Sequence, residues 1–253
     1  MSLSPETSSG EGVRINRFLA AAGLGSRRKV EELVLSGRVT INGQPVRDLA
    51  ARVDPERDRV RVGGRVVPPP RRVVYVLLHK PVDCLTTTHD PEGRRTIYEH
   101  LRGAPMPILP VGRLDRMTEG LLILTNDGPL AFRLAHPRYE VERVYRLWAA
   151  GEIDDRTVRR FRMGVRIEGR LVRPTEVRVV HRAEKRTVLE VVLHEGKNRE
   201  IRRICRELQL RVDRLVRVQF GPLSIRGLGP GEWRFLSEKE ADSLRRSVRL
   251  GVS

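Results

Sequence analysis

The sequence predicts a two-domain α+β protein, in which a small mixed module precedes a larger domain built on a β-sheet. Short runs rich in β-branched residues, such as residues 73–78, alternate with stretches in which apolar residues recur at helical spacing. Three consecutive prolines at residues 68–70 separate the first part of the chain from the rest. Such a run forms a stiff, extended connector. A chain of 253 residues, 39% of them hydrophobic, is long enough and apolar enough for one large and one small core.

Changes in composition set the expected domain limits. The first twelve residues are rich in Ser, Thr, Gly and Glu and have no apolar centre, so we expect a flexible tail and no signal peptide. The expected parts are a tail over residues 1–12, a small module over 13–67, a Pro-rich linker over 68–72, the larger domain over 73–243 and a basic tail over 244–253.

Residues 13–67 predict two short helices followed by hairpins. Apolar residues at helical spacing begin at Ile15 and end at Gly23, and Ser26 is a good N-cap for a second helix that stops at Gly37. The alternating residues 39–41 and 59–62 each lead into a turn pair, Asn42-Gly43 and Gly63-Gly64. Asn-Gly is the strongest short hairpin signal.

The larger domain mixes strand and helix patterns. We expect Pro129 in a first helical turn, with Asp127 or Gly128 near the cap. Strands are expected at residues 73–79, 108–111, 121–124, 142–149, 165–168, 177–180, 188–194 and 215–220, and helices at 96–101, 129–135, 154–163, 199–208 and 238–246.

Charge is the strongest compositional signal. The net charge is +17, and both parts of the chain contribute, because residues 1–72 hold 14 basic and 8 acidic side chains. Five of the 49 basic residues are lysine; arginine binds phosphate through a planar fork, although a GC-rich genome also raises its frequency. The balance favours a nucleic-acid partner over a membrane surface and does not separate RNA from DNA.

The cysteines and apolar runs exclude several classes. Cys84 and Cys205 are isolated, which argues against a disulfide framework or a zinc site and fits a reducing cytoplasm. The longest apolar run, residues 73–78, is too short to cross a bilayer. We expect no metal, no cofactor, no membrane partner and a monomer.

Residues 111–128 hold the most informative pattern. They indicate a strand end, a charged loop, the apolar run 121–124 and an Asn-Asp-Gly turn. Asp115 lies in the loop between Arg113 and Arg116, where positive charge favours an ionised carboxylate. An ordinary turn or capping aspartate is compatible with the same pattern.

These residues resemble the signature of bacterial ribosomal small-subunit-type pseudouridine synthases, and the resemblance is closest to the B-type branch, which acts on large-subunit ribosomal RNA. It extends over nearly the whole chain, to about Trp233. The motifs are Gly112-Arg113-Leu114-Asp115, Thr118-Glu119-Gly120-Leu121-Leu122, Thr125-Asn126-Asp127-Gly128, Leu134-Ala135-His136-Pro137 and Val141-Glu142-Arg143-Val144-Tyr145. The implied fold is a mixed, mainly antiparallel sheet flanked by helices, and the implied reaction isomerises uridine.

The resemblance implies three catalytic residues. Asp115 would be the catalytic carboxylate, Tyr145 would pack against the target base, and Arg202 would pair with Asp115. Carboxylates are known nucleophiles at glycosidic centres, and a flipped base needs an aromatic or apolar wall. An arginine partner would keep the carboxylate charged in a desolvated pocket. A half-buried structural tyrosine is the alternative for Tyr145.

Two neighbouring positions are less clear. Lys80-Pro81 resembles the first motif of this family, which usually reads Lys-Pro-x-Gly, and this chain has Asp83 at the position of the glycine. Aspartate tolerates the left-handed conformation better than most residues, so we expect the turn to be kept. Glu119 is close to Asp115, but a uracil anion leaves with little help, so we expect loop capping for Glu119 and no catalytic role.

The helix pair with a basic start resembles the S4 RNA-binding domain. A helix N-terminus with three cations suits a phosphate, although charge runs are usually solvated faces. The candidate RNA-binding residues are Arg17, Arg27, Arg28, Lys29, Arg38, Arg113, Lys197 and Arg199.

The sequence therefore predicts a cytoplasmic enzyme that converts one uridine of ribosomal RNA, most simply 23S RNA or a ribosomal-subunit precursor, to pseudouridine. One alternative is a non-catalytic S4-type RNA-binding or ribosome-assembly protein. Another is a carboxylate-dependent N-glycosidase that releases free base.

Overall fold

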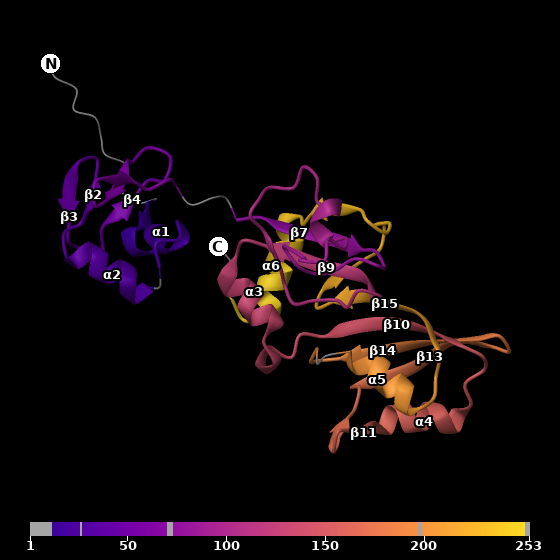
Figure 1. The fold of residues 1–253 in the computed structure, drawn as a ribbon. Coiled ribbons are helices and arrows are strands. Elements are labelled where there is room, and N and C mark those ends of the chain that lie inside the picture. The colour runs from indigo at the N-terminus through magenta and orange to yellow at the C-terminus, as the bar shows by residue number, and fades with distance from the viewer. Residues whose placement is uncertain (1–11, 26, 70–72, 197–198, 251–253) are drawn as a thin grey trace. The chain divides into compact units, whose positions relative to one another are not determined.

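The computed structural model describes residues 12–25, 27–69, 73–196 and 199–250. The chain forms two compact units, within residues 1–72 and 73–253, which are described separately (Figure 1). Of the expected tail only Gly12 lies in the described part, and of the expected linker only Pro68 and Pro69.

The first unit packs two helices on small antiparallel sheets. Its elements are β1 (Val13–Arg14), α1 (Ile15–Ala21), α2 (Arg27–Leu35), β2 (Val39–Ile41), β3 (Gln44–Val46), β4 (Arg52–Val53), β5 (Val60–Val62) and β6 (Arg65–Val66). The four-stranded sheet has the order β3-β2-β5-β6, and β1 pairs with β4. Asn42 and Gly43 both have positive φ between β2 and β3, which confirms the predicted hairpin. Ile15, Phe18 and Val30 are fully or almost fully buried in the core.

The second unit is built on a nine-stranded mixed sheet. The order of its main path is β13-β14-β10-β15-β9-β7-β17, and β16 and β8 pair with β15 and β9. The strands are β7 (Tyr75–Lys80), β8 (Leu109–Pro110), β9 (Glu119–Thr125), β10 (Arg143–Ala150), β13 (Glu176–Ala183), β14 (Arg186–Leu193), β15 (Val212–Phe220), β16 (Leu223–Ser224) and β17 (Trp233–Phe235). A separate hairpin joins β11 (Val165–Ile167) to β12 (Arg170–Val172).

Helices flank the sheet, so the α+β prediction with a mixed, mainly antiparallel sheet is confirmed. None of the described helices is long and apolar enough to span a bilayer. The helices are η1 (Ile97–His100), α3 (Gly128–Ala135), η2 (Pro137–Tyr139), α4 (Asp155–Met163), α5 (Glu200–Glu207) and α6 (Glu238–Ser247). Asp127 is the N-cap of α3, where its Oδ1 accepts a hydrogen bond from Leu130 N at 3.1 Å, as predicted.

Strand β9 divides its side chains between two cores. Leu122 and Leu124 pack into a core that includes residues of α4 and α5, whereas Leu121 and Ile123 pack into a second core with residues of α3 and α6. Alternate residues of a strand point to opposite faces of a sheet, so β9 is covered on both sides. All seven residues of β9 are buried.

Gly120 allows β9 to meet β15. These two strands pair in parallel through Glu119 and Gly120, while the other pairings described for this sheet are antiparallel. Gly120 has φ of +119°, and a Cβ atom at this position would lie 2.4 Å from the carbonyl oxygen of Arg217. A side chain is therefore excluded where the two strands touch.

The expected basic tail over residues 244–253 is wrong in its first half. Helix α6 continues to Ser247, and the side chains of Leu244 and Val248 are buried in the second core. Burial of these two apolar residues fixes the end of the chain to the sheet up to this point.

Candidate active site

Asp115 lies in a short loop between β8 and β9, as predicted. Its carbonyl oxygen accepts a hydrogen bond from Thr118 N at 3.0 Å, which closes a turn at the end of the loop. The side chain is half-buried, and it lines a pocket of about 390 Å³. The same pocket is lined by Tyr145 and Arg202, so the fold brings together the three residues that the sequence predicted as catalytic.

Tyr145 supplies an aromatic wall to this pocket. It lies in β10, where it is in register with Val191 of β14 and Arg217 of β15. Its side chain is 8% exposed and belongs to the core that also holds Ile201 of α5. The ring is thus held in place by its neighbours while it lines the pocket.

Arg202 makes a different contact from the expected one. Its Nη2 donates a hydrogen bond to the carbonyl oxygen of Met117 at 2.7 Å, and in the described part of the chain no ion pair joins it to Asp115 within 4.0 Å. Burial lowers the pKa of the Arg202 guanidinium, and the charge of Asp115 opposes this shift. The direct pairing is therefore corrected: Arg202 holds the backbone of the Asp115 loop, and the charge of Asp115 acts on its guanidinium without an ion pair between them.

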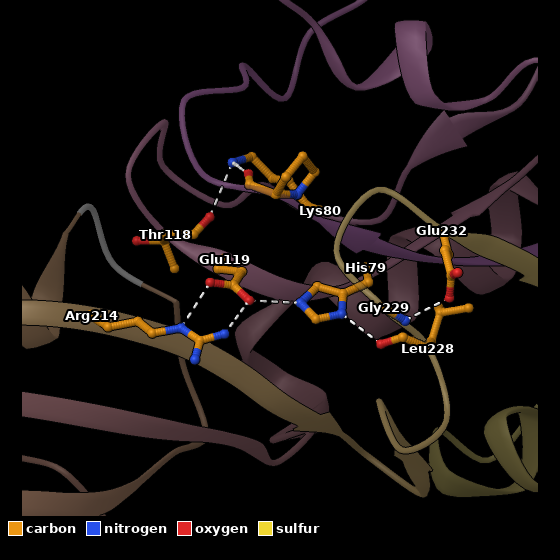
Figure 2. A network of polar contacts seen from close by, with 9 residues as sticks. His79, Lys80, Thr118, Glu119, Arg214, Leu228, Gly229 and Glu232 are labelled. Atoms are coloured by element: carbon orange, nitrogen blue, oxygen red, sulfur yellow. Dashed lines mark hydrogen bonds and ion pairs between the residues drawn. The ribbon is translucent and has the colours of Figure 1, made fainter.

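Lys80 holds the same loop from the other side. Its fully buried ammonium donates to three carbonyl oxygens, those of Pro81 at 2.9 Å, Arg116 at 3.2 Å and Thr118 at 3.0 Å. Figure 2 shows the contact with Thr118. Burial lowers the pKa of Lys80 to about 8, and nearby negative groups, Asp115 among them, oppose the shift. In the sequence, Lys80 was recognised only as part of a motif. Its position at the end of β7, after the apolar residues Val76, Leu77 and Leu78 and next to His79, is the signal for a buried cation.

Asp83 takes up the backbone conformation that glycine usually provides. Its φ is +58°, and its carboxylate forms an ion pair and a hydrogen bond with Arg116 of the Asp115 loop. The expectation that aspartate is tolerated in this turn is confirmed. The pair is exposed on both sides, so its contribution to stability is small.

Glu119 is a buried carboxylate that contacts buried His79 and half-exposed Arg214 beside the loop. Its carboxylate accepts hydrogen bonds from Arg214 at 2.6 and 3.0 Å and contacts Nε2 of His79 at 2.9 Å, and Nδ1 of His79 lies 2.7 Å from Leu228 O (Figure 2). Burial would raise the pKa of Glu119, but the hydrogen bonds from Arg214 and His79 lower it. The expected loop-capping role is wrong, because Glu119 begins β9 and joins it to β7 and β15.

Two buried arginines of the pocket were missed as functional candidates. Arg143 donates to the carbonyl oxygens of Val141, Leu134 and His194 at 2.8 to 3.1 Å. Arg217 donates to Leu121 O at 2.8 Å, and both guanidinium groups lie about 5 Å from the ring of Phe220. Burial, followed by the charge of Arg217, lowers the pKa of Arg143.

A pattern in the sequence could have identified Arg143. It lies two residues before Tyr145 in the same strand, so both side chains face the same side of the sheet. Arg217 also lies beside Tyr145, because the two residues are register partners in β15 and β10. Both arginines line the pocket together with the exposed Arg113 and Arg199.

The remaining predicted RNA-binding residues lie mainly in the first unit. Arg17, Arg28, Lys29 and Arg38 are exposed on or next to α1 and α2. Arg27 begins α2, but its side chain lies outside the described part, as does the whole of Lys197. In the described ranges no group of three or more metal-ligating side chains is found.

Comparison with known proteins identifies the family. The sequence matches the RNA pseudouridylate synthase family over residues 74–207 and the S4 domain over residues 13–58. The chain belongs to the RNA pseudouridine synthase family and carries an N-terminal S4 domain. It is therefore an enzyme that isomerises uridine to pseudouridine, as the sequence motifs predicted.

Relatives match along almost their whole length. An uncharacterized RNA pseudouridine synthase of Aquifex aeolicus is 44% identical over 239 residues, which cover 94% of this chain and 96% of the relative. Ribosomal large subunit pseudouridine synthase B of Bacillus subtilis is 35% identical over 234 residues, covering 92% and 95% of the two chains. A crystal structure of a pseudouridylate synthase shares the fold, with a TM-score of 0.62 and 23% identity over 92% of this chain and 99% of that one.

Proposed function

We propose that this enzyme converts a uridine of large-subunit ribosomal RNA, free or in a subunit precursor, to pseudouridine, and that Asp115 is its catalytic carboxylate. The observation that carries the proposal is the pocket in which Asp115 and Tyr145 lie among cationic side chains. The large-subunit substrate is supported by the similarity to the Bacillus subtilis enzyme named for that subunit. We further propose that the enzyme works in the cytoplasm as a monomer.

The reaction needs no group donor. The bond between C1′ of the ribose and N1 of uracil breaks, the base turns, C1′ joins C5 of the same base, the proton on C5 is lost, and N1 takes up a proton. A carboxylate next to the sugar can add to C1′ or assist in removing a proton from the ribose. Asp115 supplies this carboxylate, on a loop that Lys80 and Arg202 hold by their backbone contacts.

The target uridine must leave its helix or loop to reach the pocket. Flipped bases are read by stacking and by hydrogen bonds to their edges. Tyr145 provides the ring against which the uracil lies, and Arg113 and Arg199 at the pocket lining provide phosphate contacts. The exposed cations of the S4 domain, Arg28 and Lys29 in particular, add backbone contacts that carry no sequence information.

Replacement of the carboxylate tests the proposal. We expect Asp115→Asn to lower tritium release from ribosomal RNA labelled with 5-tritiated uridine by at least about a thousandfold, with unchanged RNA affinity. The matched control is Asp213→Asn, because Asp213 is an aspartate of β15 that pairs with Arg211. Undiminished turnover by the Asp115 variant would refute the assigned role.

Product analysis separates the proposal from its alternatives. Nucleoside digestion of treated ribosomal RNA should yield pseudouridine, whereas an N-glycosidase would leave abasic sites and a binding protein would leave uridine unchanged. Labelled small-subunit RNA serves as the comparison substrate. Turnover of small-subunit RNA alone would overturn the large-subunit assignment and leave the reaction type intact.

A further inference from the structure

Three rings gather at the end of α3, outside the pocket that holds Asp115. Phe132, His136 and Tyr139, here called the ring shelf, form two successive contacts with ring centroids 5.2 and 6.4 Å apart. The chain has only 11 Phe, Trp and Tyr residues in all, and two of them lie here within eight positions. Phe132 is 56% exposed, so core packing does not account for its position.

Two arginines flank the ring shelf. The guanidinium carbons of Arg133 and Arg138 lie 5.5 and 4.7 Å from the centre of the Tyr139 ring. Arg138 is exposed and also donates to the Tyr139 hydroxyl, whereas Arg133 is anchored on the carbonyl oxygens of Val248 and Arg249. Rings with arginine neighbours form the combination that binds single-stranded nucleic acid by stacking and cation–π contact.

The ring shelf is continuous with the active-site pocket. Ala135 and Pro137, the two chain neighbours of His136, both line that pocket. Arg143, a buried pocket residue, donates to Leu134 O at 3.1 Å and so fixes the end of α3 against β10. His136 is also held, because its Nδ1 accepts a hydrogen bond from Arg138 N at 3.2 Å.

We propose that the ring shelf is a nucleobase-binding subsite, on which an unpaired base next to the flipped uridine stacks while Arg138 contacts its phosphate. The inference rests on the proposed entry of a uridine into the Asp115 pocket. It adds a second recognition position outside that pocket. Stacking tolerates any base, because each base has a π-face, so this subsite contributes affinity and placement rather than a strict sequence requirement.

The first test uses a probe that contains no uridine. A fluorescent oligocytidylate RNA cannot be a substrate, so its binding is measured independently of catalysis. We expect Phe132→Ala to weaken its binding about tenfold, and Phe132→Tyr to retain it. The matched control is Phe235→Ala, because Phe235 is 51% exposed but lies on β17 and packs edge-on against Trp233.

The dependence on salt separates stacking from charge. Phe132→Ala removes no phosphate contact, so the slope of log affinity against log salt should stay at the wild-type value. Arg138→Gln should reduce that slope by about 0.7 if it loses one contact to single-stranded RNA. A change of slope in the Phe132 variant would contradict the stacking assignment.

The second test locates the bound base directly. Oligocytidylate carrying 5-iodocytidine is photo-crosslinked to the full chain, and the modified peptide is identified by mass spectrometry. Crosslinks within residues 132–139 support the ring shelf, and crosslinks confined to other segments refute it. Thermal melting of each variant, expected to be unchanged because the substituted residues Phe132 and Arg138 are exposed, confirms that the variants are folded.

Other occupants of the ring shelf give distinct results. The S4 domain or a second copy of the chain could cover these rings instead of a base. In that case, Phe132→Ala would bind oligocytidylate as well as the Phe235→Ala control does and would have an altered sedimentation coefficient. This result would overturn the inference. A wild-type enzyme that binds oligocytidylate through the shelf yet forms no pseudouridine in ribosomal RNA would refute the proposed function alone.

Discussion

The two units of the molecule differ in the burial of their basic residues, because the catalytic unit holds buried cations as well as exposed ones. In the S4 domain, Arg17, Arg28 and Arg38 are exposed. In the catalytic unit, Lys80 and Arg143 are buried and each donates to three backbone carbonyl oxygens. The net charge of +17 therefore overstates the charge available to RNA, because some of these cations hold the loops and strands of the active site.

Loss of a buried cation should have the largest effect. Arg143→Met leaves three carbonyl oxygens without their donor, and each stranded buried acceptor costs about 1–3 kcal/mol. We expect the free energy of unfolding, measured in urea, to fall by about 3 kcal/mol or more. The control Arg160→Met, at an exposed position in the last turn of α4, should stay within about 0.5 kcal/mol of wild type. Equal stabilities for the two variants would show that the buried and the exposed arginine contribute alike to stability.

Lys80 should add a dependence on pH that an exposed lysine lacks. Its pKa is about 8 in the folded protein and 10.5 in a model chain. Between these values the unfolded state binds a proton that the folded state has lost, so stability rises with pH. The stability difference between wild type and Lys80→Met should therefore grow by about 1 kcal/mol between pH 7 and pH 9.

The matched control for Lys80 is Lys185→Met, because Lys185 is exposed in the turn between β13 and β14. Its stability difference from wild type should not change over the same range. A flat difference for Lys80→Met as well would show that the buried ammonium keeps its proton throughout.

Loss of an exposed cation of the S4 domain should have the smallest effect on stability and should instead weaken RNA binding. We expect Arg28→Gln to change the free energy of unfolding by less than about 0.5 kcal/mol. If Arg28 contacts a phosphate, the slope of log RNA affinity against log salt should fall by about 1 for duplex RNA. Filter binding across a salt series measures this, and an unchanged slope would assign Arg28 to the solvated face.

Sequence patterns predicted those features of the fold that depend on a few neighbouring residues. The Asn42-Gly43 hairpin, the Asp127 cap and the tolerance of Asp83 for positive φ each depend on one or two residues and their backbone, and each was predicted. Strand β17 was missed because Trp233–Phe235 is only three residues long, too short for its alternation to stand out, and is stabilised by pairing with β7.

The sequence predicted which residues of the candidate site share a pocket but not the contacts that they make. Asp115, Tyr145 and Arg202 line one pocket, as the motifs indicated. However, Arg202 donates to Met117 O, and Glu119 pairs with Arg214, which lies 95 positions later in the chain. Such pairings depend on which strands become neighbours. Residue type and spacing along the chain do not specify these pairings. The strand pattern shows that Arg143 shares a face with Tyr145, but the backbone contacts of Arg143 and Arg217 depend on which strands become neighbours and were missed.

The absence of a side chain at Gly120 has a further consequence for the pocket. Asp115 is carried by the loop that enters β9, and Arg217 is carried by β15, so two of the segments that line the pocket meet where Glu119 and Gly120 pair with Val216 and Arg217. An alanine there would push the segments apart and widen the space that a uracil ring must fill. Glycine at position 120 therefore lets β9 and β15 lie close enough together to keep the pocket narrow where a uracil ring would bind.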